Sequence, residues 1–166
     1  MIRRFFLTGN LLLFASVAGC SADYSYVPQP AVAQVGSTTQ PQATPVTTLV
    51  SILGVRQADR KEGIPESFEA RMRIENNGSE PVVFDPKTLE MENWQLLPFP
   101  PPFVRPPGPV TVPPMGAANF TAFFPFPALP PNADLDSLEI RWVIRIGSHD
   151  VNQSVTFRRV YQWADY

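Results

Sequence analysis

The sequence has little cysteine, histidine or excess charge, and each shortage excludes a class of protein. Among 166 residues there is one cysteine, Cys20, and one histidine, His149. A single cysteine cannot form an internal disulfide, and ordinary structural zinc sites need four cysteine or histidine ligands. Lys and Arg number 13 against 15 Asp and Glu, so the chain lacks the basic excess that binding to nucleic-acid phosphates requires. We therefore expect neither a metal site nor a nucleic-acid partner.

Motifs for catalysis and cofactor binding are also missing. The sequence contains no phosphate-binding loop, dinucleotide fingerprint or metal-binding helix motif. His149 lies between Ser148 and Asp150 in a predicted turn, where neighbouring side chains cannot converge on one atom as a nucleophilic triad requires. Glu90 and Glu92 alternate with apolar residues, which places them in water, where carboxylates make poor general acids. The sequence thus predicts no catalytic residue, no cofactor and no enzymatic activity.

One short segment, residues 132–136, carries oxygen ligands at alternate positions, as the start of a calcium loop does. Ser137 and Val143 stand where such a loop requires glycine and glutamate. We therefore expect an ordinary turn held by hydrogen bonds from Asp side chains.

The first twenty residues have the order of a secretory signal. Two arginines, Arg3 and Arg4, precede an apolar stretch over residues 5–17, which is shorter than the roughly 20 residues of a membrane-spanning helix. Val17-Ala18-Gly19-Cys20 closely resembles the lipobox of bacterial lipoproteins. The resemblance implies removal of residues 1–19 and attachment of lipid, palmitate among others, to Cys20. The alternative is an ordinary signal peptide with a chance cysteine.

The same resemblance predicts where the protein lies in the cell. Ser21 follows the cysteine where lipoproteins of the inner membrane often carry Asp, so in a Gram-negative cell the outer membrane is favoured, on its periplasmic or its surface face. Residues 3–7 also resemble a twin-arginine export signature, so that route and the general secretory route both stay open. We expect a lipid-anchored protein of the cell envelope.

Proline is abundant, with 20 residues in the chain against a usual level of about 5%. Four prolines fall in residues 20–45, a segment without Lys or Arg after the cysteine and without an apolar period, which predicts a flexible, lipidated tether. Tyr24 and Tyr26 in this tether are expected to be solvated or to rest at lipid headgroups. Another 13 prolines fall in residues 98–131, so only three punctuate the remainder.

From residue 46 onward the hydrophobic period becomes two, which indicates half-buried strands. The clearest alternation covers residues 68–75, and the longest covers residues 138–146, with Trp142 on the apolar face. About seven or eight short strands predict a single all-β antiparallel sandwich over residues 46–160, followed by an aromatic tail over residues 161–166.

Two passages within these strands resemble the immunoglobulin-like domains of bacterial envelope proteins. One is the strand that ends in Asn77-Gly78 with Pro81 after it, and the other is Val110-Thr111-Val112-Pro113 before a Phe-rich strand. The resemblance implies an immunoglobulin-like architecture and no particular activity. Asn77-Gly78 also predicts a hairpin, because it offers the positive φ of a tight turn between two apolar strands.

The proline-rich insertion is the candidate partner site. Residues 98–103 must be extended, so they serve either as a stiff ligand for a partner's aromatic groove or as a crossover loop whose phenylalanines cap the sandwich. The candidate contacts are Phe99, Phe103, Arg105 and the tail residue Trp163. Together these features predict a non-catalytic lipoprotein whose sandwich binds another envelope component. An accessory structural subunit of an envelope assembly is the alternative, and a carbohydrate-binding module or enzyme is less favoured.

Overall fold

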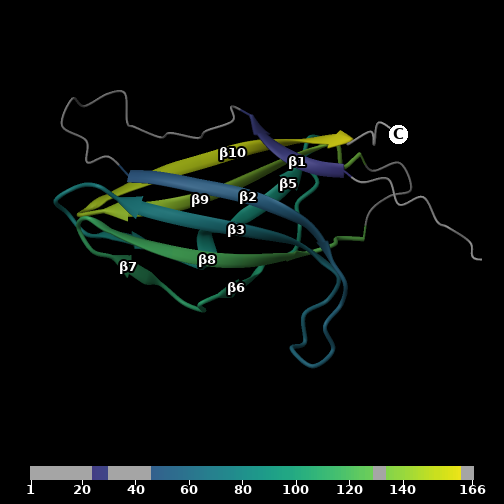
Figure 1. Cartoon of the computed structure of the whole chain (residues 1–166), viewed down its shortest axis with the longest axis horizontal. Coiled ribbons are helices and arrows are strands. Elements are labelled where there is room, and N and C mark those ends of the chain that lie inside the picture. The colour runs from purple at the N-terminus through teal and green to yellow at the C-terminus, as the bar shows by residue number, and fades with distance from the viewer. Residues whose placement is uncertain (1–23, 30–45, 129–133, 162–166) are drawn as a thin grey trace, which may run out of the picture.

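The computed structural model describes residues 24–29, 46–128 and 134–161, and these residues form an antiparallel β-sandwich without an α-helix (Figure 1). The predicted fold class is confirmed, with ten strands in place of the seven or eight expected. The strands and one 3-10 helix are β1 (Tyr24–Gln29), β2 (Val46–Arg56), β3 (Ser67–Asn76), β4 (Val82–Phe84), η1 (Pro86–Thr88), β5 (Glu90–Asn93), β6 (Phe103–Arg105), β7 (Val110–Val112), β8 (Gly116–Pro125), β9 (Ser137–Ile146) and β10 (His149–Tyr161).

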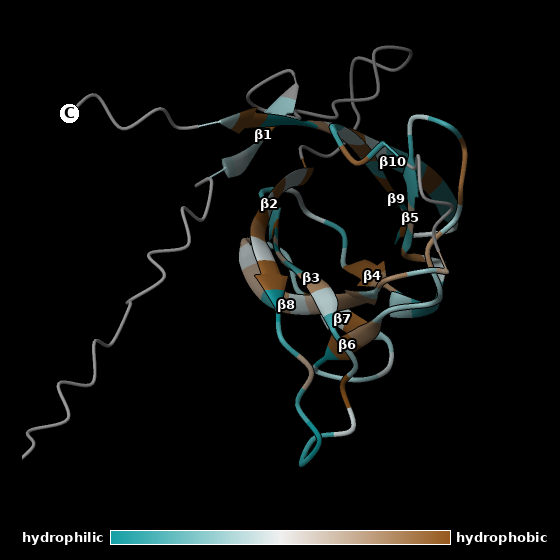
Figure 2. Cartoon of the chain, turned by 90° about the vertical axis from the view of Figure 1, so that its right-hand side faces the viewer, coloured by the Kyte–Doolittle hydropathy of each residue, from teal (hydrophilic) through white to brown (hydrophobic). Residues whose placement is uncertain are grey.

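The strands form two sheets that face each other, as the end-on view of Figure 2 shows. One sheet has the order β2-β3-β8-β6, and the other has the order β1-β10-β9-β4-β7, with β5 also paired to β9. In chain order, the first sheet corresponds to strands A-B-E-D of an immunoglobulin domain, and β10-β9-β4 corresponds to G-F-C. The immunoglobulin-like topology predicted from the sequence is therefore present, with β1, β5 and β7 as additions.

The core lies between the sheets because inward residues alternate along each strand. On β9, Leu138, Ile140, Trp142 and Ile144 are all fully buried, as their period predicted. Val155 and Phe157 of β10 are buried as well. This agreement follows from the register, since a slip of one residue would turn every apolar side chain to water.

Part of the predicted tether is a strand. β1 pairs with β10 along its whole length, from Tyr24 opposite Tyr161 to Gln29 opposite Thr156. Tyr26 is buried, and its ring meets Phe68 edge-on with 5.5 Å between centroids. The prediction of a flexible, solvated segment is therefore wrong for residues 24–29, because pairing with β10 and burial of Tyr26 offset the cost of ordering them. The other residues of the predicted tether lie outside the described part of the chain.

The predicted hairpin at Asn77-Gly78 is also wrong. β3 and β4 do not pair, because β3 lies in one sheet and β4 in the other. The buried side chain of Asn76 holds this crossing: its Nδ2 donates to the carbonyl oxygens of Glu80 (2.7 Å) and Val112 (3.2 Å), and its Oδ1 accepts from the Gly78 amide (3.1 Å). The chain does bend at Gly78, as the sequence indicated. The sheet that β4 joins depends instead on contacts with residues distant in sequence, such as Val112.

Candidate binding groove around helix η1

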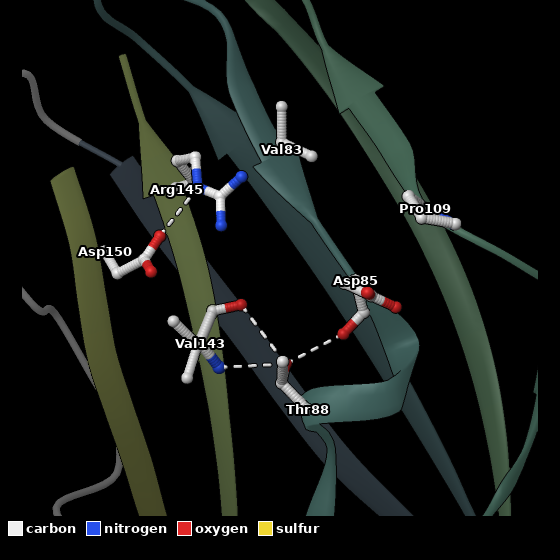
Figure 3. A pocket seen from close by; sticks show the side chains of 7 residues that line it. All are labelled: Val83, Asp85, Thr88, Pro109, Val143, Arg145 and Asp150. Atoms are coloured by element: carbon white, nitrogen blue, oxygen red, sulfur yellow. Dashed lines mark hydrogen bonds and ion pairs between the residues drawn. The ribbon is translucent and has the colours of Figure 1, made fainter. Parts of the chain in front are cut away.

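A group of surface hollows follows from an interruption in the sheet. β4 and β5 both pair with β9, but helix η1 separates them, so Trp142 and Val143 of β9 have no strand partner on that side. The side chain of Thr88 takes the place of this partner (Figure 3). Its Oγ1 donates to the Asp85 carbonyl (2.8 Å) and accepts from the Val143 amide (3.1 Å). This bridge fixes η1 beside β9, in the gap between β4 and β5.

On one side of Thr88 lies a hollow of about 310 Å³ with Arg145 and Asp150 at its rim (Figure 3). Arg145 Nε donates to Asp150 Oδ1 at 2.8 Å across the β9–β10 pair. The pKa of Arg145 is raised above its usual value by this hydrogen bond and by the carboxylate charge, so the arginine is a fixed cation. Val83 and Pro109 supply the apolar wall.

On the other side of Thr88, Lys87 borders three further hollows. The one over β9 and β10 measures about 570 Å³ and is lined by Arg141, Asn152 and Ser154 among others. The one against the proline-rich segment measures about 450 Å³ and includes Pro101, Pro102 and Pro107. The fourth measures about 260 Å³ and reaches Glu92 and Pro98. We call the four adjoining hollows the η1 groove.

The η1 groove presents charges of both signs beside short apolar surfaces. Arg141 forms an ion pair with Glu92, and Lys87 and Glu90 are exposed nearby. Within the described residues, His, Cys, Asp and Glu side chains form no group of three able to hold a metal ion. A small molecule is usually enclosed on most sides, whereas this groove is open and crosses several strands. Its shape and chemistry suit an extended polypeptide.

Glu92 differs from its prediction. It lies on the outer face of the sheet, as the alternation indicated, but its side chain is only 12% exposed. Pairing with Arg141 and a backbone bridge to Pro98 remove it from water. The carboxylate is therefore an ion-pair partner within the groove.

The predicted partner contacts have different positions. Phe99 is only 7% exposed and packs on Phe68 and Phe126, with centroids 5.9 and 6.5 Å apart. The prediction that Phe99 contacts a partner is wrong; it caps the core, as the alternative interpretation of the insertion held. The reason is that the chain crosses from one sheet to the other here and needs an apolar side chain to close the end of the sandwich.

Phe103 and Arg105 remain accessible on β6, on the outer face of the other sheet. Arg105 is half exposed, pairs with Glu62 at 3.0 Å and stacks on the buried ring of Phe123. Arg56 stacks on the same ring with 5.0 Å to its centroid. The two arginines thus cover an outward phenylalanine, and Phe103 beside them is exposed.

The remaining sequence predictions have mixed outcomes. Cys20 and Trp163 lie outside the described residues, so the lipidation site and the tail contact stay predictions. Asp136 donates its amide to Asp134 Oδ1 (2.7 Å), the hydrogen bond expected of an ordinary turn. Trp94, directly after the end of β5, is 59% exposed.

Comparison with known proteins assigns no family to this chain. No family model matches it, and no curated protein matches it. A solved structure titled "X-ray structure of Northeast Structural Genomics Consortium target SoR45" aligns with 73% of this chain and 88% of its own, at 10% identity and a TM-score of 0.36. In the part of the chain that the structure describes, no helix has the length and apolar character needed to cross a bilayer.

Proposed function

We propose that this protein is a non-catalytic lipoprotein of the cell envelope, whose sandwich binds an extended segment of another envelope protein in the η1 groove. Support for the anchor comes from Val17-Ala18-Gly19-Cys20 at the end of a secretory signal. Support for binding comes from the groove itself, where apolar walls alternate with fixed charges along several strands. Extended peptides are commonly recognised by such surfaces on β-domains.

Photocrosslinking in cells that produce the full chain tests the binding proposal. A photoreactive amino acid replaces Lys87 or Asn152, both exposed in the groove, and in a matched control it replaces Arg71, exposed on the other sheet. We expect the two groove positions to capture the same envelope protein and the control position not to capture it. Equal capture at Arg71, or no capture from the groove, contradicts the proposal.

The anchor has a separate test. Cys20→Ser should leave the precursor uncleaved and unlabelled by palmitate, because the acylated atom is the cysteine sulfur. Normal labelling of this variant contradicts the lipoprotein proposal without affecting the groove experiment.

An accessory structural subunit is the second candidate, and exposed Phe103 and Arg105 on β6 favour it. Deletion of residues 98–107 is a poor test, because it removes the buried Phe99 together with β6. Phe103→Ala with Arg105→Ala leaves the core intact. Loss of co-purification from this double variant, with crosslinking from Lys87 retained, would assign the interface to β6.

A further inference from the structure

The position of β1 limits how far the folded domain can lie from its lipid anchor. Tyr24 is already paired with Tyr161, and only residues 21–23 separate it from Cys20. Four residues reach at most about 14 Å when fully extended. If Cys20 carries the lipid, as proposed above, the start of β1 lies within that distance of the membrane surface. A stalk of 25 residues between lipid and domain is therefore ruled out by the pairing of β1.

The end of the sandwich that faces the anchor includes more than β1. The last residue of β10 lies there. Loop 57–66 lies there too, since Arg56 and Ser67, which flank it, pair at this end. Loop 94–97 is the third element, because the Trp94 amide donates to the carbonyl of Ser137, where β9 begins. We call this the β1 end; it faces the viewer in Figure 2. Exposed apolar or aromatic side chains that lie at this end or within a few residues of it include Tyr24, Val27, Val55, Trp94, Leu96, Val160 and Tyr161.

The loop that carries Trp94 and Leu96 is held in place from beneath. The buried side chain of Asn93 accepts from the amides of Gln95 (3.1 Å) and Leu97 (2.9 Å) through Oδ1 and donates to the Asp134 carbonyl (3.1 Å) through Nδ2. Leu96 has a φ of 59°, a left-handed conformation that is unfavourable for a residue with a branched side chain. The hydrogen bonds of Asn93 hold this backbone conformation, which keeps the side chain of Leu96, 71% exposed, at the tip of the loop.

The chemistry of the β1 end matches the headgroup layer of a bilayer. Tryptophan and tyrosine are favoured there, because their rings are apolar and their polar atoms stay hydrated. Arg159 stacks between Tyr24 and Tyr161, with 5.4 and 5.1 Å to the two ring centroids, and so places a cation beside both rings. Asp136 neutralises this arginine by an ion pair. Binding should therefore depend on apolar contact more than on anionic lipid.

We infer that the β1 end rests directly on the membrane, with Trp94 and Leu96 inserted at the level of the headgroups. This inference rests on the proposed lipid anchor and adds the orientation of the domain. The lipid restrains the start of β1, and the 94–97 loop supplies a second contact that stops the domain from turning about the short connection.

Leu96 and Met115 form a matched pair for the test. Met115, between β7 and β8 at the opposite end, has a φ of 58° and is 79% exposed. Leu96→Cys and Met115→Cys therefore disturb the fold to a similar degree. Each full-length variant is isolated from membranes as the acylated protein, labelled with a nitroxide at the new cysteine and reconstituted in phosphatidylcholine vesicles.

Power-saturation electron paramagnetic resonance then compares how often the nitroxide collides with oxygen, which enters lipid, and with a nickel complex, which stays in water. We expect oxygen to exceed nickel severalfold at position 96 and the reverse at position 115. Nickel-dominated collisions at both positions, on protein whose mass shows the acyl chains, overturn the inference and leave the anchor standing. A mass without acyl chains overturns the anchor and the inference together.

A second measurement covers the case in which labelling disturbs the loop. In the acylated protein of unaltered sequence, lipids brominated near the headgroup should quench part of the tryptophan emission. Trp94→Phe should remove that quenched part. Equal quenching before and after Trp94→Phe contradicts the inference.

Discussion

Replacing Tyr26 by alanine tests whether β1 is an integral part of the domain. The Tyr26 hydroxyl donates to the Leu135 carbonyl at 2.8 Å, and its ring lies edge-on to Phe68. Truncation of a buried aromatic side chain to alanine costs roughly 3–5 kcal/mol, of which the hydrogen bond contributes about 1 kcal/mol. Since small domains have total stabilities of about 5–15 kcal/mol, this loss is large.

The loss has an upper limit set by the docking of β1 itself. Among the described strands, β1 pairs only with β10, so it can detach while the two sheets stay folded. Once it has detached, further weakening of its contacts cannot lower the stability of the sandwich. Tyr26→Ala should therefore expose β1 and the β10 edge to hydrogen exchange, in addition to lowering the free energy of unfolding.

Urea unfolding followed by the fluorescence of buried Trp142, together with hydrogen exchange of the β1 amides, measures both effects. Tyr26→Phe serves as one control and should lose only about 0.5–1.5 kcal/mol, because the ring stays. Tyr24→Ala is a second control, with a smaller loss, because Tyr24 is exposed. An unchanged urea midpoint for Tyr26→Ala, with β1 amides already unprotected in the wild type, would refute the assignment of β1 to the domain.

Three further perturbations test other parts of the structure. In urea unfolding followed by circular dichroism, Trp142→Ala should lower the free energy of unfolding by roughly 3–5 kcal/mol, since its ring is fully buried. A loss below about 1 kcal/mol would contradict the burial of Trp142 in the core. Asn76→Ala should cost about 1–3 kcal/mol in the same urea assay, because two buried carbonyl groups lose their donor. Burial raises the pKa of the Tyr26 hydroxyl, so this hydroxyl ionises at lower pH in the unfolded chain than in the folded one. The free energy of unfolding should therefore fall as pH rises above about 10. Tyr26→Phe should lessen this fall in urea titrations at pH 9 to 11.

The sequence predicted the strands whose burial is set locally. β3, β9 and β10 alternate apolar and polar residues over many positions, so their existence and inner faces could be predicted from period alone. β5 ends at Asn93, where the alternation of apolar and polar residues loses its phase.

Where the prediction failed, the deciding contact lies far away in the sequence. β1 has a composition typical of a tether, and its partner β10 lies more than a hundred residues further along the chain. The alternation of Tyr24 and Tyr26 was the available signal, but two positions are too few to distinguish a strand from coil. Likewise, β6 is a short edge strand among prolines, a position where proline is tolerated and where no period can develop.

The η1 groove had no signal in the sequence beyond Asp85-Pro86, which indicates a turn. The hollow exists because that turn interrupts a strand on β9, and because Thr88 fills the gap with a side chain. Both facts depend on the register between β4, β5 and β9. That register is set by contacts between strands, so the groove could not be predicted from the sequence alone.

Together, the orientation on the membrane and the position of the groove constrain a partner. β9 runs from Ser137, beside Trp94, to Arg145, at the far rim of the η1 groove. Eight residues of extended strand span about 27 Å. With the β1 end on the membrane, as proposed above, the Arg145–Asp150 rim would project into the aqueous phase, and Glu92 and Pro98 would lie near the lipid. A segment that fills the whole groove must rise away from the membrane along β9, so a photoreactive group at Asp150 should capture a part of the partner more distant from the bilayer than one at Glu90.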